Sequence, residues 1–237
     1  MDIGKSFSYQ FEDKQWISKL GLGAVISLVP ILNFAMSGYI VDILRNVENN
    51  VAEPLPNWDD LSKKFSDGLI LFAAGLIYAA PLLPVICLPL GALSFSSLIA
   101  SNGNFQDFGR SIAGVGAVLF YCLLCIFILY LMVLSLIYPA ILVMFSRAGT
   151  FSACFKFRQA FDMVGRNAGP FITAWIVSVG AGLGVGLIVG FINALIGWIP
   201  CFGWIVALIL GLGFGVYIIT VHAHLFGQFG AVALTQN

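Results

Sequence analysis

Charge is the scarcest property of this sequence. Only 9% of its 237 residues are Asp, Glu, Lys or Arg, whereas 60% are hydrophobic. Soluble domains carry roughly 25% charged residues, and a chain with so few could not cover a water-facing surface. Eleven basic residues are balanced by eleven acidic ones, which leaves no electrostatic basis for binding nucleic acid. We therefore expect a protein whose solvent is lipid, without a nucleic-acid partner.

The sequence also lacks the residue patterns that most catalytic and metal sites need. It has two histidines, and because they are two residues apart on an expected helix they point to different faces. There is no zinc signature, nucleophile–base pair or pair of catalytic carboxylates. Cys122 and Cys125 form a C-x-x-C inside an apolar run, where small hydrophobic residues are expected. We expect no cofactor, no metal and no catalysis, and keep a membrane-bound lipid enzyme assembled from distant loops as an alternative.

Long apolar runs, by contrast, are abundant. A membrane-spanning helix needs about 20 mostly apolar residues, and runs of this order occupy residues 17–47, 68–100, 111–146, 168–196 and 200–230. The second run is too long for one plain crossing and contains Pro81, Pro84 and Pro89, so we expect its helix to kink or break there. The pattern predicts one all-α membrane domain over residues 1–237, a helical bundle with about four to six spanning segments.

The first apolar run has two interpretations. Pro30 and Asn33 interrupt it, much as Pro200 and the nearby Asn193 interrupt the last pair of runs. It is therefore either one bent crossing or a hairpin of two short arms. Cytoplasmic loops are enriched in Lys and Arg. A hairpin places ten of the eleven basic residues on one side of the membrane, and a single crossing places seven there. We favour the hairpin, with both termini cytoplasmic.

Two polar stretches between crossings are predicted to be amphipathic helices in the membrane interface. The first covers residues 57–67, with Trp58 at headgroup depth, Asn57 or Asp59 as the helix cap, and Gly68 turning the chain into the next crossing. The second covers residues 150–166 and ends at Arg166. Because each stretch separates two crossings, we expect an internal repeat of about 15–100 and 111–230.

Several polar residues lie within or beside the expected crossings. Asp42 and Arg45 are three apart and can pair on one helix, so anchoring is favoured over transport. Asn33 and Asn193 are expected to cap broken helix ends, with ligand binding as the alternative. His224 and Gln228 share a helix face and can bond to another helix. Close helix packing is expected of the glycines in the fourth run: Gly180, Gly184, Gly186 and Gly190.

The combined pattern resembles a family of prokaryotic integral membrane proteins known as domain of unknown function 4013. The residues that carry the resemblance are Gly38-Tyr39, Arg45-Asn46, Leu55-Pro56-x-Trp58-Asp59, Phe65-x-Asp67-Gly68, Arg147, the Phe151–Phe161 stretch, Arg166-Asn167 and the tail His224-Leu225-x-Gly227-Gln228. Ala168 departs from the pattern, which has proline there, and Asn49-Asn50 stand where glycine is more usual. The resemblance implies a multi-pass protein of a prokaryotic inner membrane, with an internal bacterial membrane as the alternative. It implies no activity.

Three functions follow as hypotheses. The first is a non-catalytic accessory or scaffold component that packs with lipid, with other membrane-protein subunits or with copies of itself. The second is a small permease or channel, which predicts a polar cavity touching Asn33 or Asn193. The third is a lipid enzyme. The low number of polar groups in the apolar runs favours the first.

Overall fold

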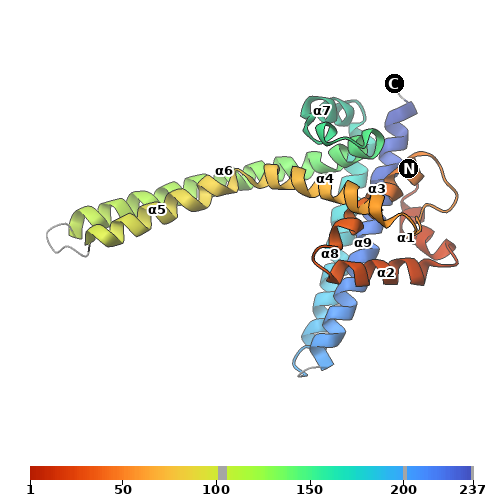
Figure 1. Ribbon diagram of the computed structural model, residues 1–237, viewed down its shortest axis with the longest axis horizontal. Helices are drawn as coiled ribbons and strands as arrows, with labels where there is room; N and C mark the ends of the chain where they lie inside the picture. The colour runs from red at the N-terminus through yellow and green to blue at the C-terminus, as the bar shows by residue number, and fades with distance from the viewer. Residues whose placement is uncertain (101–105, 200–201, 236–237) are drawn as a thin grey trace. The chain divides into compact units, whose positions relative to one another are not determined.

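A computed structural model describes residues 1–100, 106–199 and 202–235, and every regular element in those ranges is a helix (Figure 1). The predicted all-α class is therefore confirmed. The predicted turn at Pro200 lies outside the described residues. The elements are α1 (Ile3–Glu12), α2 (Trp16–Leu28), α3 (Asn33–Glu48), α4 (Leu61–Ala79), α5 (Leu82–Ala100), α6 (Gln106–Ala148), η2 (Phe151–Phe155), α7 (Phe157–Arg166), α8 (Ala168–Ile196) and α9 (Phe202–Thr235).

Four of the described helices are long and apolar enough to cross a bilayer. They cover Leu82–Ile99, Asp107–Ala148, Ala168–Ile196 and Phe202–Thr235. Most of their large apolar side chains are exposed on the outside of the protein, for example Leu129 at 61% and Leu187 at 74%. An apolar outer surface of this kind is stable in hydrocarbon and costly in water. The chain is therefore a multi-pass helical membrane protein.

The chain forms two compact units, which are described one at a time. The larger unit holds residues 1–72 and 137–237, and the smaller unit holds residues 73–136. These boundaries differ from those of the expected repeat, 15–100 and 111–230, which stays a prediction.

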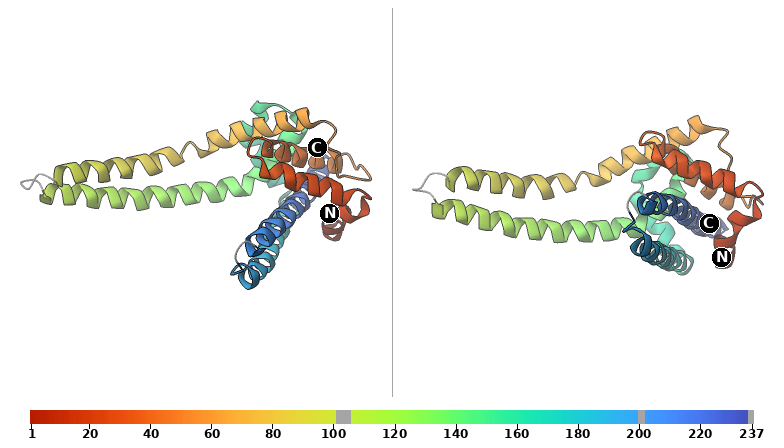
Figure 2. Two further views of the ribbon diagram at one scale, coloured as in Figure 1. Left: turned by 60° about the horizontal axis from the view of Figure 1, so that its bottom comes forward. Right: turned by 90° about the horizontal axis from the view of Figure 1, so that it is seen from below.

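The smaller unit consists of the end of α4, α5 and most of α6. The chain breaks between α4 and α5 at Ala80 and Pro81, as predicted, whereas Pro84 and Pro89 lie inside α5 and do not end it. α5 and α6 run side by side (Figure 2), and Ala92 packs on Gly116, where a Cβ would lie 2.9 Å from it. The Tyr130 hydroxyl donates to the carbonyl oxygen of Tyr78 at 2.9 Å. The two thiols of the C-x-x-C are free and exposed on α6, so they do not line a site inside this unit.

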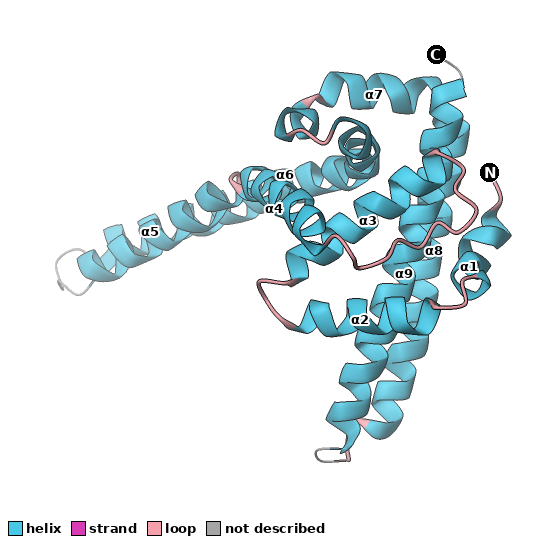
Figure 3. Cartoon of the chain, turned by 45° about the vertical axis from the view of Figure 1, so that its right-hand side comes forward, coloured by secondary structure: helices cyan, strands magenta, loops and turns pink. Residues whose placement is uncertain are grey.

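The larger unit is built on α8 and α9, which lie side by side, with α1, α2 and α3 crossing α9 (Figure 3). The core lies between α3 and α9, where Tyr39, Ile43, Val221, Leu225 and Phe229 are fully buried. Their burial removes apolar surface from solvent and holds the short helices on the long one.

The N-terminal apolar run is a helical hairpin. α2 ends at Leu28, and after the turn at 29–32 the chain returns as α3. The arms contain 13 and 16 residues. At about 1.5 Å per residue each is about 20–24 Å long, which is less than the roughly 30 Å of a hydrocarbon core. Neither arm is therefore long enough to cross a bilayer unaided.

The predicted interfacial helix at 57–67 is wrong in extent. Residues 57–60 are not helical, and α4 begins at Leu61 and continues far beyond Asp67. The cap is Asp60, whose carboxylate accepts from the backbone N–H of Lys63 at 3.1 Å. Gly68 does not turn the chain, because it lies inside α4 against the backbone of Phe34. Trp58 precedes the helix, and its half-buried ring stacks on Tyr39.

The predicted interfacial helix at 150–166 exists as two shorter elements, η2 and α7. Ala153, Cys154 and Ala160 are buried, whereas the side chains of Phe151 and Phe161 are 42% and 54% exposed. This segment keeps an apolar outer side beside its basic residues. Its position at a membrane interface stays a prediction.

Candidate functional site

The most distinctive site in the larger unit is the crossing of α3 over α4, which two glycines make possible. A Cβ at Gly38 would lie 2.6 Å from the Cα of Lys64, and a Cβ at Gly68 would lie 3.2 Å from the Cα of Phe34. Phe34 and Gly38 are one helical turn apart, as are Lys64 and Gly68. Each glycine therefore lies against the backbone of the other helix, an approach that only residues without a side chain allow.

This close approach brings four charged side chains together. Arg45 donates through Nη1 to Asp42 Oδ1 at 2.9 Å and to Asp67 Oδ2 at 2.7 Å. Lys64 Nζ lies 3.0 Å from the second oxygen of Asp42. Arg45 also donates through Nε to the carbonyl oxygen of Ser146 at 2.8 Å, which ties α6 to the group. We call Asp42, Arg45, Lys64 and Asp67 the ionic cluster.

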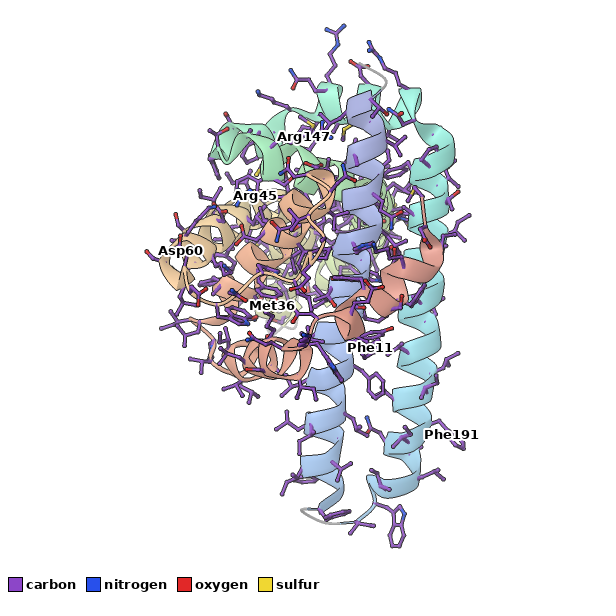
Figure 4. The ribbon with its side chains drawn as sticks, turned by 90° about the vertical axis from the view of Figure 1, so that its right-hand side faces the viewer. Phe11, Met36, Arg45, Asp60, Arg147 and Phe191 are labelled. Carbon is purple, nitrogen blue, oxygen red and sulfur yellow. The ribbon has the colours of Figure 1, made fainter. Side chains whose placement is uncertain are left out.

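A second ion pair lies one turn further along α3. The guanidinium of Arg147 is 3.4 Å from each carboxylate oxygen of Glu48 and donates to the carbonyl oxygen of Gly230 in α9 at 2.8 Å. Burial raises the pKa of Glu48, and the charge of Arg147 opposes that rise. Figure 4 places Arg45 and Arg147 near one end of the larger unit, away from Phe191 at the other. The two arginines therefore join α3, α4, α6 and α9.

The charges of these groups balance, because three carboxylates face three cations. Side-chain exposure within the ionic cluster is between 5% and 20%. Charges held this far from water require partners, and here they have them. Among the described residues no group of three or more His, Cys, Asp or Glu is placed to hold a metal ion. The arrangement can fix helices in register, and it leaves no described carboxylate of the cluster unpaired for proton transfer.

Trp58 belongs to a strap of residues 54–58 across the α2–α3 hairpin. Its ring stacks on Tyr39 with centroids 4.4 Å apart, and its indole N–H donates to the carbonyl oxygen of Lys19 at 2.9 Å. Lys19 in turn donates to the carbonyl oxygen of Leu55 at 3.0 Å, and its ammonium lies 2.6 Å from the carboxylate of Asp13. Trp58 therefore does not lie on a helix as predicted, and its half-buried ring fastens the hairpin, while its place at headgroup depth stays a prediction. Asp59 beside it is exposed.

His224 and Gln228 form a separate polar group between α9 and α1. His224 Nδ1 lies 2.9 Å from the Ser6 hydroxyl and 3.0 Å from Gln228 Nε2, and the imidazole stacks on Tyr9 at 4.3 Å. The Gln228 side chain also exchanges two hydrogen bonds with the backbone of Asp2, at 2.6 and 2.9 Å. The two residues thus hold the N-terminal helix on α9.

The remaining predicted residues are dispersed. Asn33 is exposed as the first residue of α3, and the cap position belongs to Leu32, so Asn33 does not cap the helix as expected. Asn193 lies in the last turn of α8, where its carbonyl oxygen accepts from Gly197 at 2.7 Å and its side-chain oxygen is buried without a partner. Arg166 ends α7 and is exposed.

The glycines of α8 do not pack as predicted. A Cβ at Gly180, Gly184, Gly186 or Gly190 would meet nothing within 4 Å. α8 instead contacts α9 through other residues, with Phe171 and Phe229 5.2 Å apart and the ring of His222 bonded to the Ser178 carbonyl at 2.9 Å. The predicted glycine faces are thus open within this chain.

Sequence reasoning missed half of the ionic cluster. Lys64 and Asp67 were not among the predicted site residues, although they are only 4% and 8% exposed. The signal that could identify Lys64 is its place one turn before Gly68, on the face that a glycine brings against a partner helix, and Asp67 follows Lys64 by three residues.

A family model described as a protein of unknown function, DUF4013, matches residues 22–194. The chain belongs to the DUF4013 family. No curated protein and no solved structure matches it. The match covers the α3–α4 crossing, the ionic cluster and the strap, whereas His224 and Gln228 lie beyond it. The DUF4013 region thus contains the α3–α4 crossing, whereas Lys19, the partner of the strap on α2, precedes it.

Proposed function

We propose that this DUF4013 protein is a non-catalytic accessory or scaffold component of a prokaryotic cell membrane, which packs its spanning helices against other membrane helices. The observation that carries the proposal is the open glycine face of α8. Gly180 and Gly184 are four residues apart on a spanning helix, and in the part of the chain that the structure describes a Cβ at either position would meet no other element within 4 Å. Small residues four apart allow a second membrane helix to approach closely.

The polar groups support the same proposal. Both aspartates of the ionic cluster are ion-paired, and Glu48 lies beside Arg147. A carrier needs a group that binds and releases its solute, whereas these groups bind one another and hold helices together. An open cavity of about 600 Å³ is lined almost wholly by apolar residues and does not touch Asn33 or Asn193.

Site-specific photo-crosslinking in native membranes tests the proposal. Leu187 lies on the same face of α8 as Gly180 and Gly184 and is 74% exposed, and Phe95 on α5 is an equally apolar control at 55%. A photoreactive residue at 187 should give one discrete product, either with a second copy or with another membrane protein, and Gly184→Leu should abolish it. Equal, diffuse labelling from 187 and 95 would count against a packing face.

The permease alternative is tested by Asp42→Asn. An ion-coupled carrier would lose its coupling while still inserting normally. A scaffold should keep the discrete crosslink from position 187 and lose only part of its stability, because one partner of Arg45 and Lys64 becomes neutral.

A further inference from the structure

The large apolar cavity is a groove between two parts of the larger unit. One wall comes from the end of α1 and the first half of α2, and the other from the stretch of α9 between Ile209 and Tyr217. Its volume of about 600 Å³ falls within the range of about 300–1,000 Å³ typical of small-molecule sites. Two glycines keep it open, since a Cβ at Gly21 on α2 or at Gly213 on α9 would meet nothing within 4 Å.

The wall offers almost no polar group to a ligand. The Tyr217 hydroxyl already donates to the carbonyl oxygen of Phe7 at 3.0 Å. The remaining lining is aliphatic, glycine or aromatic, with Phe11 set edge-on to Trp16 at 4.9 Å. A polar solute or an ion would lose its hydration here without compensation, so the chemistry of the wall selects a hydrocarbon.

The surroundings of the groove identify the source of that hydrocarbon. α9 is a spanning helix, and its side chains next to the groove face outward, with Ile205 58% and Leu208 53% exposed. On the other wall Ile17 is 69% and Val25 59% exposed. The groove therefore opens onto a continuous apolar surface, and the medium at its opening is the lipid bilayer.

The polarity of α9 changes along the groove in a single direction. Beyond Tyr217 toward the C-terminus come Thr220, His224 and Gln228, which hydrogen-bond to α1. Toward Ile209 the helix carries only apolar residues and glycine. Trp and Tyr favour the boundary between headgroups and hydrocarbon. Trp16 and Tyr217 thus mark the headgroup end, and Ile209 lies about 12 Å deeper along the helix, at about 1.5 Å per residue.

We propose that this groove binds one acyl chain of a membrane phospholipid, with its headgroup beside Trp16 and its tail directed along α9 toward Ile209. The short hairpin and α9 would then share a resident lipid that fills the space left by Gly21 and Gly213. This proposal goes beyond the scaffold function and is independent of it, since a lipid in this groove is compatible with any partner on α8.

Quenching of Trp16 fluorescence by phospholipid brominated in its acyl chains tests the proposal. Trp175, Trp198 and Trp204 are replaced by Phe, and Trp58, half-buried where it stacks on Tyr39, remains as a background that the Trp16→Phe variant measures separately. The purified protein in detergent is titrated with dibrominated phosphatidylglycerol. We expect quenching that saturates near one equivalent, whereas simple partitioning would rise in proportion to the lipid added and would overturn the proposal.

A matched pair of substitutions locates the site. Gly213→Leu fills the groove, while Gly211→Leu places the same side chain two residues away, at a position also open but outside the lining. Gly213→Leu should weaken the saturable quenching about tenfold, the effect of roughly two methylene groups no longer buried, and Gly211→Leu should leave it unchanged.

Gly21→Leu fills the groove from the opposite wall. It provides a second test of the site in case Gly213→Leu does not fold. A circular dichroism melt within a few degrees of the parent shows that each variant is folded. Saturable quenching that survives in folded Gly213→Leu and Gly21→Leu alike would overturn the proposal. The proposal would also be overturned if filling the groove changed the oligomeric state and left the quenching unaltered. A helix of a second copy would then be the occupant.

Discussion

The α3–α4 crossing allows a quantitative prediction for a single methyl group. Gly38→Ala adds a Cβ 2.6 Å from the Cα of Lys64, whereas non-bonded carbon atoms prefer about 3.5–4.0 Å. The obstacle is backbone, so it cannot rotate away as a side chain could. The helices must separate by about 1 Å to relieve the overlap. Gly68→Ala meets the backbone of Phe34 in the same way.

Two opposing effects set the size of the change. Overpacking in a closely fitted contact costs about 1–3 kcal/mol, and the upper end applies here because separation also lengthens the ion pairs of Arg45 and Lys64. Alanine in place of glycine inside a helix stabilises the helix by up to about 1 kcal/mol, which offsets part of that cost. We therefore expect each single substitution to lower the free energy of unfolding by about 1–2 kcal/mol.

Gly75→Ala is the matched control, because it lies in the same helix α4 and its Cβ would meet nothing within 4 Å. It should be neutral or stabilising by up to about 1 kcal/mol. The double variant Gly38→Ala with Gly68→Ala should cost less than the sum of the two, since the first substitution already separates the helices that the second would push apart. Denaturant titration in detergent, followed by circular dichroism, gives all four values.

The reasoning would be refuted if Gly38→Ala and Gly68→Ala matched Gly75→Ala in stability. Additive costs at the two positions would show that the glycines act separately and that α3 and α4 do not meet as one crossing.

Four further outcomes are expected. Burial raises the pKa of Glu48 against the opposing charge of Arg147, so the folded state binds this proton more readily than the unfolded state. The free energy of unfolding should therefore fall as pH rises above the ordinary value of 4.5, and Glu48→Gln should flatten that part of a denaturant-derived pH profile. Arg147→Ala should cost about 2 kcal/mol, below the roughly 3–5 kcal/mol of a fully buried pair because Arg147 is 28% exposed, and adding Glu48→Gln should restore much of it. Gln228→Ala releases the backbone of α1 and should speed tryptic cleavage after Lys5, read by mass spectrometry. Cys125, exposed on a spanning helix, should resist a membrane-impermeant maleimide in vesicles and react once the protein is solubilised and unfolded.

The helices could be predicted where a single physical rule governs them. Bilayer thickness and runs of apolar residues identify α8 and α9, and the proline rule identifies the break at Pro81. The start of α4 could not be placed in the same way. Asn57, Asp59 and Asp60 all cap helices well, so the local sequence does not decide between them. In the structure Trp58 stacks on Tyr39 and Asp60 is the cap, so Asn57 lies outside the helix.

The site was harder to predict because its contacts are tertiary. The pairing of Asp42 with Arg45 follows from a three-residue spacing on one helix. Arg45 and Asp42 each have a second partner in α4. Asp67 lies 22 residues beyond Arg45, and no local periodicity predicts their contact. The glycines of α8 show the converse. Their spacing permits close packing, but spacing does not say whether the partner helix lies in the same chain.

The distribution of polar chemistry in this DUF4013 protein bears on what the family region does. Residues 22–194 contain the two glycines of the crossing, the ionic cluster and the strap, which join α2 to α3 and join α3 to α4 and α6. The four spanning helices, which all come later in the chain, carry mainly apolar side chains facing outward. A protein built to move a polar solute would place its polar groups along the spanning helices, where the solute must pass. Here the ionic cluster holds α3, α4 and α6 together, and the exposed side chains of the spanning helices are apolar, which supports the proposed scaffold over a carrier.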